Sequence, residues 1–390
     1  MRILTVLLLL TGMMPFQAEA RQTKQQQQSE VYLLTIQPGK EIYSMYGHSA
    51  LRVVIPDRNF DNVFNWGVFD FSTPNFGFKF AKGRLDYMLA VYPYDRFMQE
   101  YFREQRTVIS QRVNLLPSEK ERLLALALEN MKPENVSYRY DFFYDNCATR
   151  IRDIIDNSVE GTLSLSQNKK RENPTFRELI DKYQKPYRWL DLGIDLLLGL
   201  PADKRARASE QMFLPDFLMS NLSDAVVTRA DGEHDLLDDP EIVYDFGTTP
   251  VTSNRFTSPF FILWSVVALV LAISLSNMKS YWQRRIDILI LSLYSLLTVL
   301  LLFTTFFTDH QALKWNANCI WLSPLIIISL IHLIFNIKAV HWYRINLTVT
   351  ALFLALSPLI PQSLNRYLVP VILILIIRLF FLSRFGKPKL

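Results

Sequence analysis

SPFFILWSVVALVLAISLS, residues 258–276, divides this chain of 390 residues into two parts. The stretch is uncharged and close to the length that an α-helix needs to cross the roughly 30 Å of hydrocarbon in a bilayer. Four further apolar runs follow, at about 286–307, 318–336, 345–360 and 367–383; the run at 345–360 is short and ends among prolines. The sequence therefore predicts an all-α transmembrane domain of about five helices over residues 258–390.

The charges divide at the same place. Residues 258–390 hold 11 Lys and Arg but two acidic residues, a net charge of +9, whereas the first 257 residues hold 31 basic and 35 acidic residues, a net charge of −4. The basic balance of the whole chain, +5, therefore belongs to its apolar part and does not indicate a nucleic-acid partner. The composition also excludes a disordered chain, a collagen-like repeat and a cysteine-stapled miniprotein.

The N-terminus has the pattern of a secretory signal. Arg2 supplies the positive charge, residues 3–10 are apolar, and residues 18–20 form an A-x-A cleavage site. The apolar run is too short to be a first transmembrane helix. We therefore expect a signal peptide over 1–20, a Gln-rich linker over 21–29, and an exported domain over 30–257.

The loop charges test this topology independently. If residues 30–257 are exported, the loops on the cytoplasmic side and the C-terminus together hold eight Lys and Arg, against two in the outer loops, Lys314 and Arg366. This asymmetry follows the positive-inside rule. The sequence thus predicts a multi-pass protein of the inner membrane with its N-terminal domain on the periplasmic side and its C-terminus in the cytoplasm.

The exported domain is predicted to be α+β, with strands early and helices late. Residues 48–55 and 61–69 alternate in polarity around a turn at 56–60, as in an antiparallel hairpin, and 107–115 is another strand. Ser118 and Glu121 form a capping box for a helix over 119–131, and Asp145 with Asn146 caps a helix that begins near Cys147. A helical extension covers about 170–230, and the acidic segment 231–239 with His234 is a solvated loop.

Cysteine usage gives the strongest indication of chemistry. Cys147 lies in the exported domain and Cys319 in the third apolar run, so the two are not expected to form a disulfide. Cys147 stands at a predicted helix N-terminus, where unpaired backbone N–H groups and the helix dipole stabilise a thiolate. A buried inert cysteine is the alternative, and we expect Cys319 to serve packing.

A nucleophilic cysteine requires a base, and His48 at the start of a strand is the candidate. A strand-borne histidine that faces a cysteine at a helix start is the geometry of papain-like thiol enzymes, here with the histidine first in the chain. A third polar group should orient the imidazole. On the partner strand Asn65 is slightly favoured and Asp70 is the alternative, because a register slip of one residue would exchange them.

Three segments carry a family resemblance: YGHSALRV (46–53), FNWGVFDFSTPNFGFKFAKGRLDYML (64–89) and YDNCATRIRDII (144–155). With the later segments 188–203, 212–218 and 309–325, they resemble the lipoprotein N-acyltransferase family called Lnb. The resemblance implies a circularly permuted NlpC/papain-like core over about 30–160, with Cys147 as nucleophile and His48 as base. It also implies transfer of an acyl chain from a membrane phospholipid, through a Cys thioester, to the N-terminal amine of a diacylated lipoprotein.

Polar residues near these segments are candidates for supporting roles. Backbone N–H groups at the helix start, aided by Asn146, could hold an oxyanion, and Arg150 could pair with a nearby acid or meet a phosphate. The other candidates are positioning residues, Tyr144 and Asp145, and substrate-binding residues, Tyr46, His310, Lys314 and Asn316. The alternative for the outer loop is an interfacial connector anchored by its tryptophans.

No phosphate-binding glycine loop or metal-binding cluster is evident, so we predict no cofactor and no metal. Competing functions are an NlpC-type peptidase acting on cell-wall peptides, a lipid esterase or phospholipase that uses the same Cys-His pair, and a non-enzymatic membrane sensor.

Overall fold

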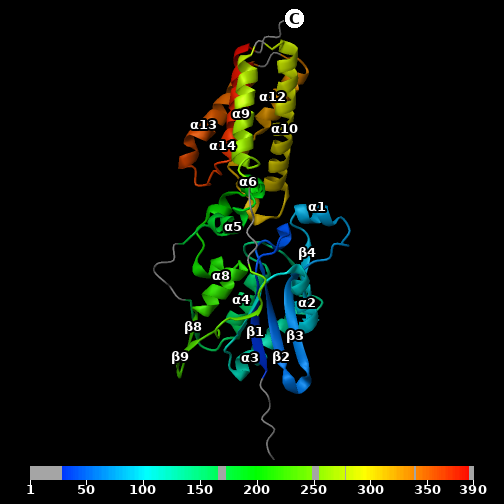
Figure 1. The fold of residues 1–390 in the computed structure, drawn as a ribbon, viewed down its shortest axis with the longest axis vertical. Helices are drawn as coiled ribbons and strands as arrows, with labels where there is room; N and C mark the ends of the chain where they lie inside the picture. The colour runs from blue at the N-terminus through cyan, green and yellow to red at the C-terminus, as the bar shows by residue number, and fades with distance from the viewer. Residues whose placement is uncertain (1–28, 166–172, 248–253, 277, 338–339, 386–390) are drawn as a thin grey trace, which may run out of the picture.

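The computed structural model describes residues 29–165, 173–247, 254–276, 278–337 and 340–385. The predicted signal peptide lies outside these residues, and so does the predicted linker apart from its last residue. Figure 1 shows two parts stacked along the long axis, a mixed α/β N-terminal domain and a helical bundle formed by the C-terminal segments.

A seven-stranded antiparallel sheet organises the N-terminal domain, with the order β10-β5-β1-β2-β3-β4-β6. The predicted hairpin is β2 and β3, joined by a 3-10 turn over Pro56–Arg58. The strands are β1 (Glu30–Ile36), β2 (His48–Ile55), β3 (Phe60–Val68), β4 (Asp86–Pro93), β5 (Val108–Arg112), β6 (Ser137–Arg139) and β10 (Glu241–Tyr244).

Alternation of side chains along the strands gives the sheet two apolar faces. Leu33 and Leu51 belong to one cluster, packed under α3 (Pro117–Asn130), α4 (Cys147–Ser158) and α8 (Pro215–Ser223). Their neighbours Leu34 and Ala50 belong to a second cluster with α2 (Tyr94–Glu104) on the opposite face. Helices therefore cover both faces of the sheet, and α4 lies on the face that carries Leu33 and Leu51.

Two local predictions are wrong. Helix α3 begins at Pro117, and its capping carboxylate is Glu119, which accepts the backbone N–H of Leu116 at 2.6 Å; the predicted box of Ser118 and Glu121 stands two residues too late. Residues 232–235 are not a solvated loop but strand β9 (Gly232–Asp235), which pairs with β8 (Val226–Arg229) next to β7 (Thr162–Ser164). Strand β10 also returns to the main sheet, so strands are not confined to the early part of the domain.

The helical part of the domain links the sheet to the bundle. It contains α5 (Phe176–Gln184), α6 (Arg188–Leu197) and α7 (Ala208–Gln211), and a short helix α1 (Phe76–Ala81) projects between β3 and β4. Helix α6 contributes Leu192, Leu196 and Leu197 to the apolar cluster of the bundle. Figure 1 accordingly shows α6 at the junction of the two parts.

The bundle contains α9 (Pro259–Leu275), α10 (Ser280–Phe307), α11 (Asn318–Trp321), α12 (Pro324–Ile334), α13 (Val340–Leu356) and α14 (Leu368–Phe385). Within the described residues, α10 alone is long and apolar enough to cross a membrane by those two criteria; α9 and the stretch Asn318–Ile334 are shorter apolar helices. The third predicted run is broken before Pro324, because proline favours the first turn of a new helix.

Candidate active site

Asn146 fixes the start of the helix that carries Cys147. Its Oδ1 accepts the backbone N–H groups of Ala148 and Thr149 at 2.9 and 3.0 Å, and the Thr149 hydroxyl accepts the Asn146 N–H in return. Its Nδ2 donates to the carbonyls of Phe142 and Phe213 at 2.8 and 2.9 Å. Because both amide hydrogens are used, the side chain cannot also donate to an oxyanion; it positions Cys147 instead.

Gly47 brings His48 to the edge of the site. Its φ is +81°, and a Cβ there would lie 2.8 Å from the carbonyl oxygen of Ile36, so only glycine fits without a shift of the backbone. His48 follows as the first residue of β2, paired with Ile36 of β1. The conformation at Gly47 therefore determines where the imidazole points.

The imidazole meets Asn65 on one side and the Cys147 thiol on the other. His48 Nε2 lies 2.6 Å from Asn65 Oδ1, which leaves Nδ1 for the sulfur. The ring of Tyr101 lies against His48, with centroids 6.5 Å apart. Asp70, the alternative third residue, is exposed and binds Ser72 in a turn. The structure thus brings together His48, Cys147 and Asn65, and leaves Asp70 outside.

Electrostatics in this site favour the charged pair. Burial raises the pKa of the Cys147 thiol, but the charge and hydrogen bond of His48, with backbone N–H groups of Ser49 and Ala148, outweigh it, and the net pKa is lowered. Burial lowers the pKa of His48, yet Cys147 and the Asn65 hydrogen bond reverse this, and the net pKa is raised. A thiolate beside an imidazolium is an activated nucleophile.

A β-bulge in β3 lets the strand approach the nucleophile. The register shifts between Trp66 and Val68, and Gly67 stands there with a φ of +89°. A Cβ on Gly67 would lie 3.6 Å from the Cβ of Cys147. A glycine in a strand indicates a bulge or a close approach, so this residue could have been recognised in the sequence and was not.

The residues just before and after Cys147 support its loop. Arg150 forms a two-pronged ion pair with Asp145 at 2.6 and 2.9 Å and lies over the ring of Tyr138, 3.6 Å from its centroid. The pairing with an acid is therefore the arrangement observed for Arg150. Tyr144 is 42% exposed and packs edge-on against Phe176, so its ring is part of the surface of this loop.

Three of the predicted substrate-binding residues make contacts within the chain. His310 Nε2 contacts the carbonyl oxygen of Phe80, and Lys314 donates to carbonyls at the end of α10, those of Thr305 and Thr308. Asn316 is buried and donates to the carbonyls of Leu196 and Leu197 on α6. The contacts of His310 and Asn316 attach the loop to the N-terminal domain, and that of Lys314 attaches it to α10; their role in binding substrate stays a prediction.

Tyr46, the fourth, is also engaged. Its hydroxyl accepts a hydrogen bond from Gln184 at 2.6 Å, and its ring packs on Phe142 and Tyr183. Burial raises its pKa to about 12. Tyr46 therefore belongs to the core under α5.

One acidic cluster among the described residues brings its oxygens within 4.8 Å of one another: Asp181, Asp191 and Asp195. Asn365 donates to Asp191 and Asp195, and Arg177 pairs with Asp195 at 2.6 Å. The cluster lacks Cys and His, and an amide and a guanidinium already occupy two of its carboxylates. It joins α5 and α6 to the bundle.

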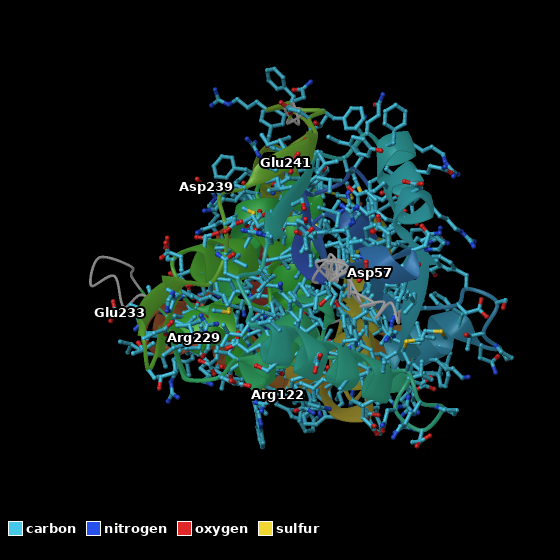
Figure 2. All side chains as sticks on the ribbon, turned by 90° about the horizontal axis from the view of Figure 1, so that it is seen from below. Asp57, Arg122, Arg229, Glu233, Asp239 and Glu241 are labelled. Carbon is cyan, nitrogen blue, oxygen red and sulfur yellow. The ribbon has the colours of Figure 1, made fainter. Side chains whose placement is uncertain are left out.

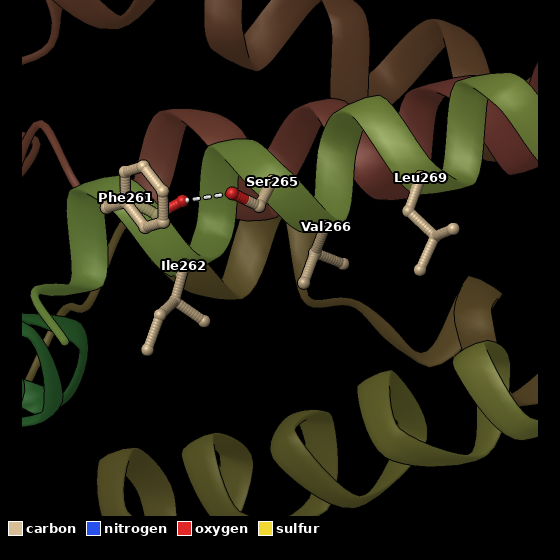
Figure 3. A pocket seen from close by; sticks show the side chains of 5 residues that line it. All are labelled: Phe261, Ile262, Ser265, Val266 and Leu269. Atoms are coloured by element: carbon tan, nitrogen blue, oxygen red, sulfur yellow. Dashed lines mark hydrogen bonds between the residues drawn. The ribbon is translucent and has the colours of Figure 1, made fainter. Parts of the chain in front are cut away.

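A shallow apolar groove lies in the bundle, far along the chain from Cys147. Figure 3 shows its lining side chains projecting from α9: Phe261, Ile262, Ser265, Val266 and Leu269. The Ser265 hydroxyl donates to the carbonyl of Phe261 at 2.8 Å, so the one polar group of the groove is satisfied by its own helix. The surface of the groove is therefore mainly hydrocarbon.

Two family models match this chain. One, described as the Lnb N-terminal periplasmic domain, matches residues 16–182, and the other, described as the Lnb transmembrane domain, matches residues 251–389. No curated protein and no solved structure matches. The first match places the mixed α/β domain in the periplasm and the second places the bundle in the membrane.

Proposed function

The chain belongs to the Lnb family, and from that premise we propose that it is a membrane-bound acyltransferase of lipoproteins that works through Cys147. Family membership suggests lipoprotein N-acylation. The finer proposal is that a phospholipid donates an acyl chain to Cys147 and that the N-terminal amine of a diacylated lipoprotein accepts it. The contact of His48 with Cys147 at the capped start of α4 is the observation that carries it.

In the first half-reaction the Cys147 thiolate attacks the carbonyl carbon of a glycerophospholipid ester. The Asn146 cap accepts the N–H groups of Ala148 and Thr149, which leaves the N–H of Cys147 itself to stabilise the oxyanion. When the C–O bond breaks, the His48 imidazolium gives its proton to the departing glycerol oxygen. The products are a thioester and a lysophospholipid.

In the second half-reaction the α-amine of the lipoprotein attacks the thioester carbonyl. Neutral His48 accepts a proton from the attacking nitrogen, the C–S bond breaks, and Cys147 leaves as a thiolate. This restores the ion pair and releases the amide. Throughout both halves, Asn65 holds the imidazole by its Nε2–H, so that Nδ1 faces the sulfur.

The proposal extends to fold and topology. A nucleophile at a helix start, packed on a sheet that carries the base and its orienting amide, supports a papain-like core in which the cysteine helix follows the sheet in the chain. The eight basic residues on one side of the apolar runs support a cytoplasmic C-terminus. We also propose that the exported catalytic domain covers residues 30–257 and the transmembrane domain residues 258–390.

Mass spectrometry of lipoprotein N-termini tests the function, in a host where this chain is the sole N-acylating enzyme. We expect Cys147→Ala and His48→Ala to leave lipoproteins diacylated, while the matched Cys319→Ala keeps them triacylated. Persistence of the third chain in Cys147→Ala would rule out the proposed function. Loss of muropeptide cleavage instead would favour a peptidase, and Cys147-dependent lysophospholipid release without N-acylation would favour a phospholipase.

A further inference from the structure

Three phenylalanines around α1 are exposed. Phe71, Phe78 and Phe80 retain 70%, 59% and 53% of their accessible surface, within ten residues of chain. Clustered apolar exposure of this kind marks a surface that meets a membrane or another protein. In contrast, the end of the domain farthest from the bundle presents charged side chains such as Asp57 and Glu233 (Figure 2).

The segment that bears these rings is fixed to the outer end of α10. The N–H of Asp309 donates to the carbonyl of Lys82 at 2.8 Å, Arg84 pairs with Asp309 at 2.8 Å, and His310 contacts the carbonyl of Phe80. Figure 1 shows α1 beside that end of α10. In the described part of the chain, α10 is the helix that satisfies the length and hydropathy criteria for crossing a membrane.

This position identifies the occupant of the patch as lipid. The last two residues of α10, Phe306 and Phe307, are 63% and 66% exposed, and aromatic rings concentrate where a span meets the headgroups. Phe71, Phe78 and Phe80 extend that aromatic zone sideways from the bundle. Lys79 and Lys82 alternate with them, as in helices that lie in an anionic interface.

A row of aromatic rings leads from the patch to the nucleophile. Ring centroids are 4.8 Å apart for Phe71 and Phe69, 5.2 Å for Phe69 and Tyr87, and 4.3 Å for Tyr87 and Tyr140. Tyr87 and Tyr140 pack against the core cluster that contains Cys147. Phe69, Tyr87 and Tyr140 are each partly buried and not fully enclosed, so part of each side chain stays accessible.

We propose that this row, Phe71–Phe69–Tyr87–Tyr140, binds the acyl chain of the lipid donor, and that the α1 patch sits in the outer leaflet and receives that chain. The inference rests on the proposed function, because it gives the thiol its lipid substrate. A chain lying along the row covers apolar ring surface that water would otherwise contact. The carbonyl at its head then reaches the sulfur while the glycerol stays near the headgroups.

Photolabelling of the full chain in nanodiscs tests this. The probe is a phosphatidylcholine with a diazirine in one acyl chain, and the protein carries Cys147→Ala so that no turnover occurs. We expect crosslinks in the peptides that contain Phe69, Tyr87 and Tyr140. Replacing Phe71, Phe78 and Phe80 together by serine should reduce this labelling about tenfold, and replacing them by leucine should restore it.

The matched control is Phe102→Ser, since Phe102 is 57% exposed but lies on α2; its labelling should equal that of the parent. Crosslinks confined to the bundle, including the α9 groove, or labelling unchanged in the triple serine variant, would overturn the inference. The result does not depend on N-acylation. If cells with Cys147→Ala still triacylate lipoproteins, the proposed function is wrong, whereas binding of an acyl chain along the aromatic row is decided by the photolabelling.

Discussion

Replacing Asn146 by alanine removes four hydrogen bonds from one buried side chain. Asn146 is 2% exposed, and its amide serves two backbone N–H groups of α4 and two carbonyls, those of Phe142 and Phe213. Loss of an N-cap costs about 1 kcal/mol. Each buried carbonyl left without a donor costs about 1–3 kcal/mol, less where water enters. We expect a total near 3 kcal/mol.

For a domain of this size, 1 kcal/mol shifts the melting temperature by about 2–4 °C, so the predicted decrease is about 6–12 °C. Intrinsic tryptophan fluorescence of the full chain in detergent during a thermal ramp measures it. The matched control is Asn157→Ala on the same helix, because Asn157 is exposed and makes one hydrogen bond, to the carbonyl of Asp153. That variant should melt within about 2 °C of the parent.

Asn146→Asp separates capping from support of the loop. The carboxylate keeps both acceptor contacts at the helix start but has no hydrogens for the carbonyls of Phe142 and Phe213. Its negative charge beside Cys147 should raise the pKa of the thiol and slow alkylation by iodoacetamide at neutral pH. If Asn146→Ala melts as high as Asn157→Ala, the cap does not hold the nucleophile as described and the reasoning fails.

Three further changes test other parts of the molecule. Burial and, to a smaller extent, the neighbouring carboxylates raise the pKa of Asp181 to about 7. Because the folded state favours the protonated form, stability falls as pH rises toward 7. Asp181→Asn should therefore reduce the fall in melting temperature between pH 5 and 8. In the bundle, Arg378 and Asp287 form a buried ion pair at 2.6 Å, so Arg378→Leu should destabilise by about 3 kcal/mol or more, while exposed Arg384→Leu changes the melting temperature little. Gly47→Ala should cost about 1–3 kcal/mol and slow alkylation of Cys147, because the added Cβ meets a carbonyl and displaces the imidazole.

Local chemistry explains what the sequence predicted well. An asparagine that precedes a helical apolar pattern caps the helix whatever the helix packs against, so the start of α4 at Cys147 could be predicted from the sequence alone. The β2–β3 hairpin followed from alternation and a short turn. In both cases the determining contacts lie within a few residues along the chain.

Register and long-range contacts explain what it did not predict. The sequence favoured Asn65 over Asp70 only slightly, because the choice depends on the register of β2 and β3; it did not show the bulge at Gly67, where the pairing of β3 with β4 shifts after Trp66. The sequence predicts substrate binding in the outer loop because polarity in a short connector is unusual, but it does not reveal the contacts of that loop within the chain. The contact of His310 with Phe80, for example, joins residues 230 positions apart in the sequence, and no local sequence pattern predicts such a contact.

The burial of Cys147 and the attachment of its domain to the bundle both serve to protect an acyl-thioester from hydrolysis. Under the proposed mechanism, an acyl-thioester must wait for a second lipid-anchored substrate while water competes for it. Cys147 is 8% exposed beneath the bulged strand, which limits that competition. The contacts of Asn316 with α6 and of Asp309 with Arg84 attach the domain to the bundle on two sides. If the thiol is held at a fixed distance from the bilayer, the amine of an anchored lipoprotein reaches it by diffusion in the plane of the membrane. The thioester then reacts soon after it forms, so that partial protection from water is sufficient.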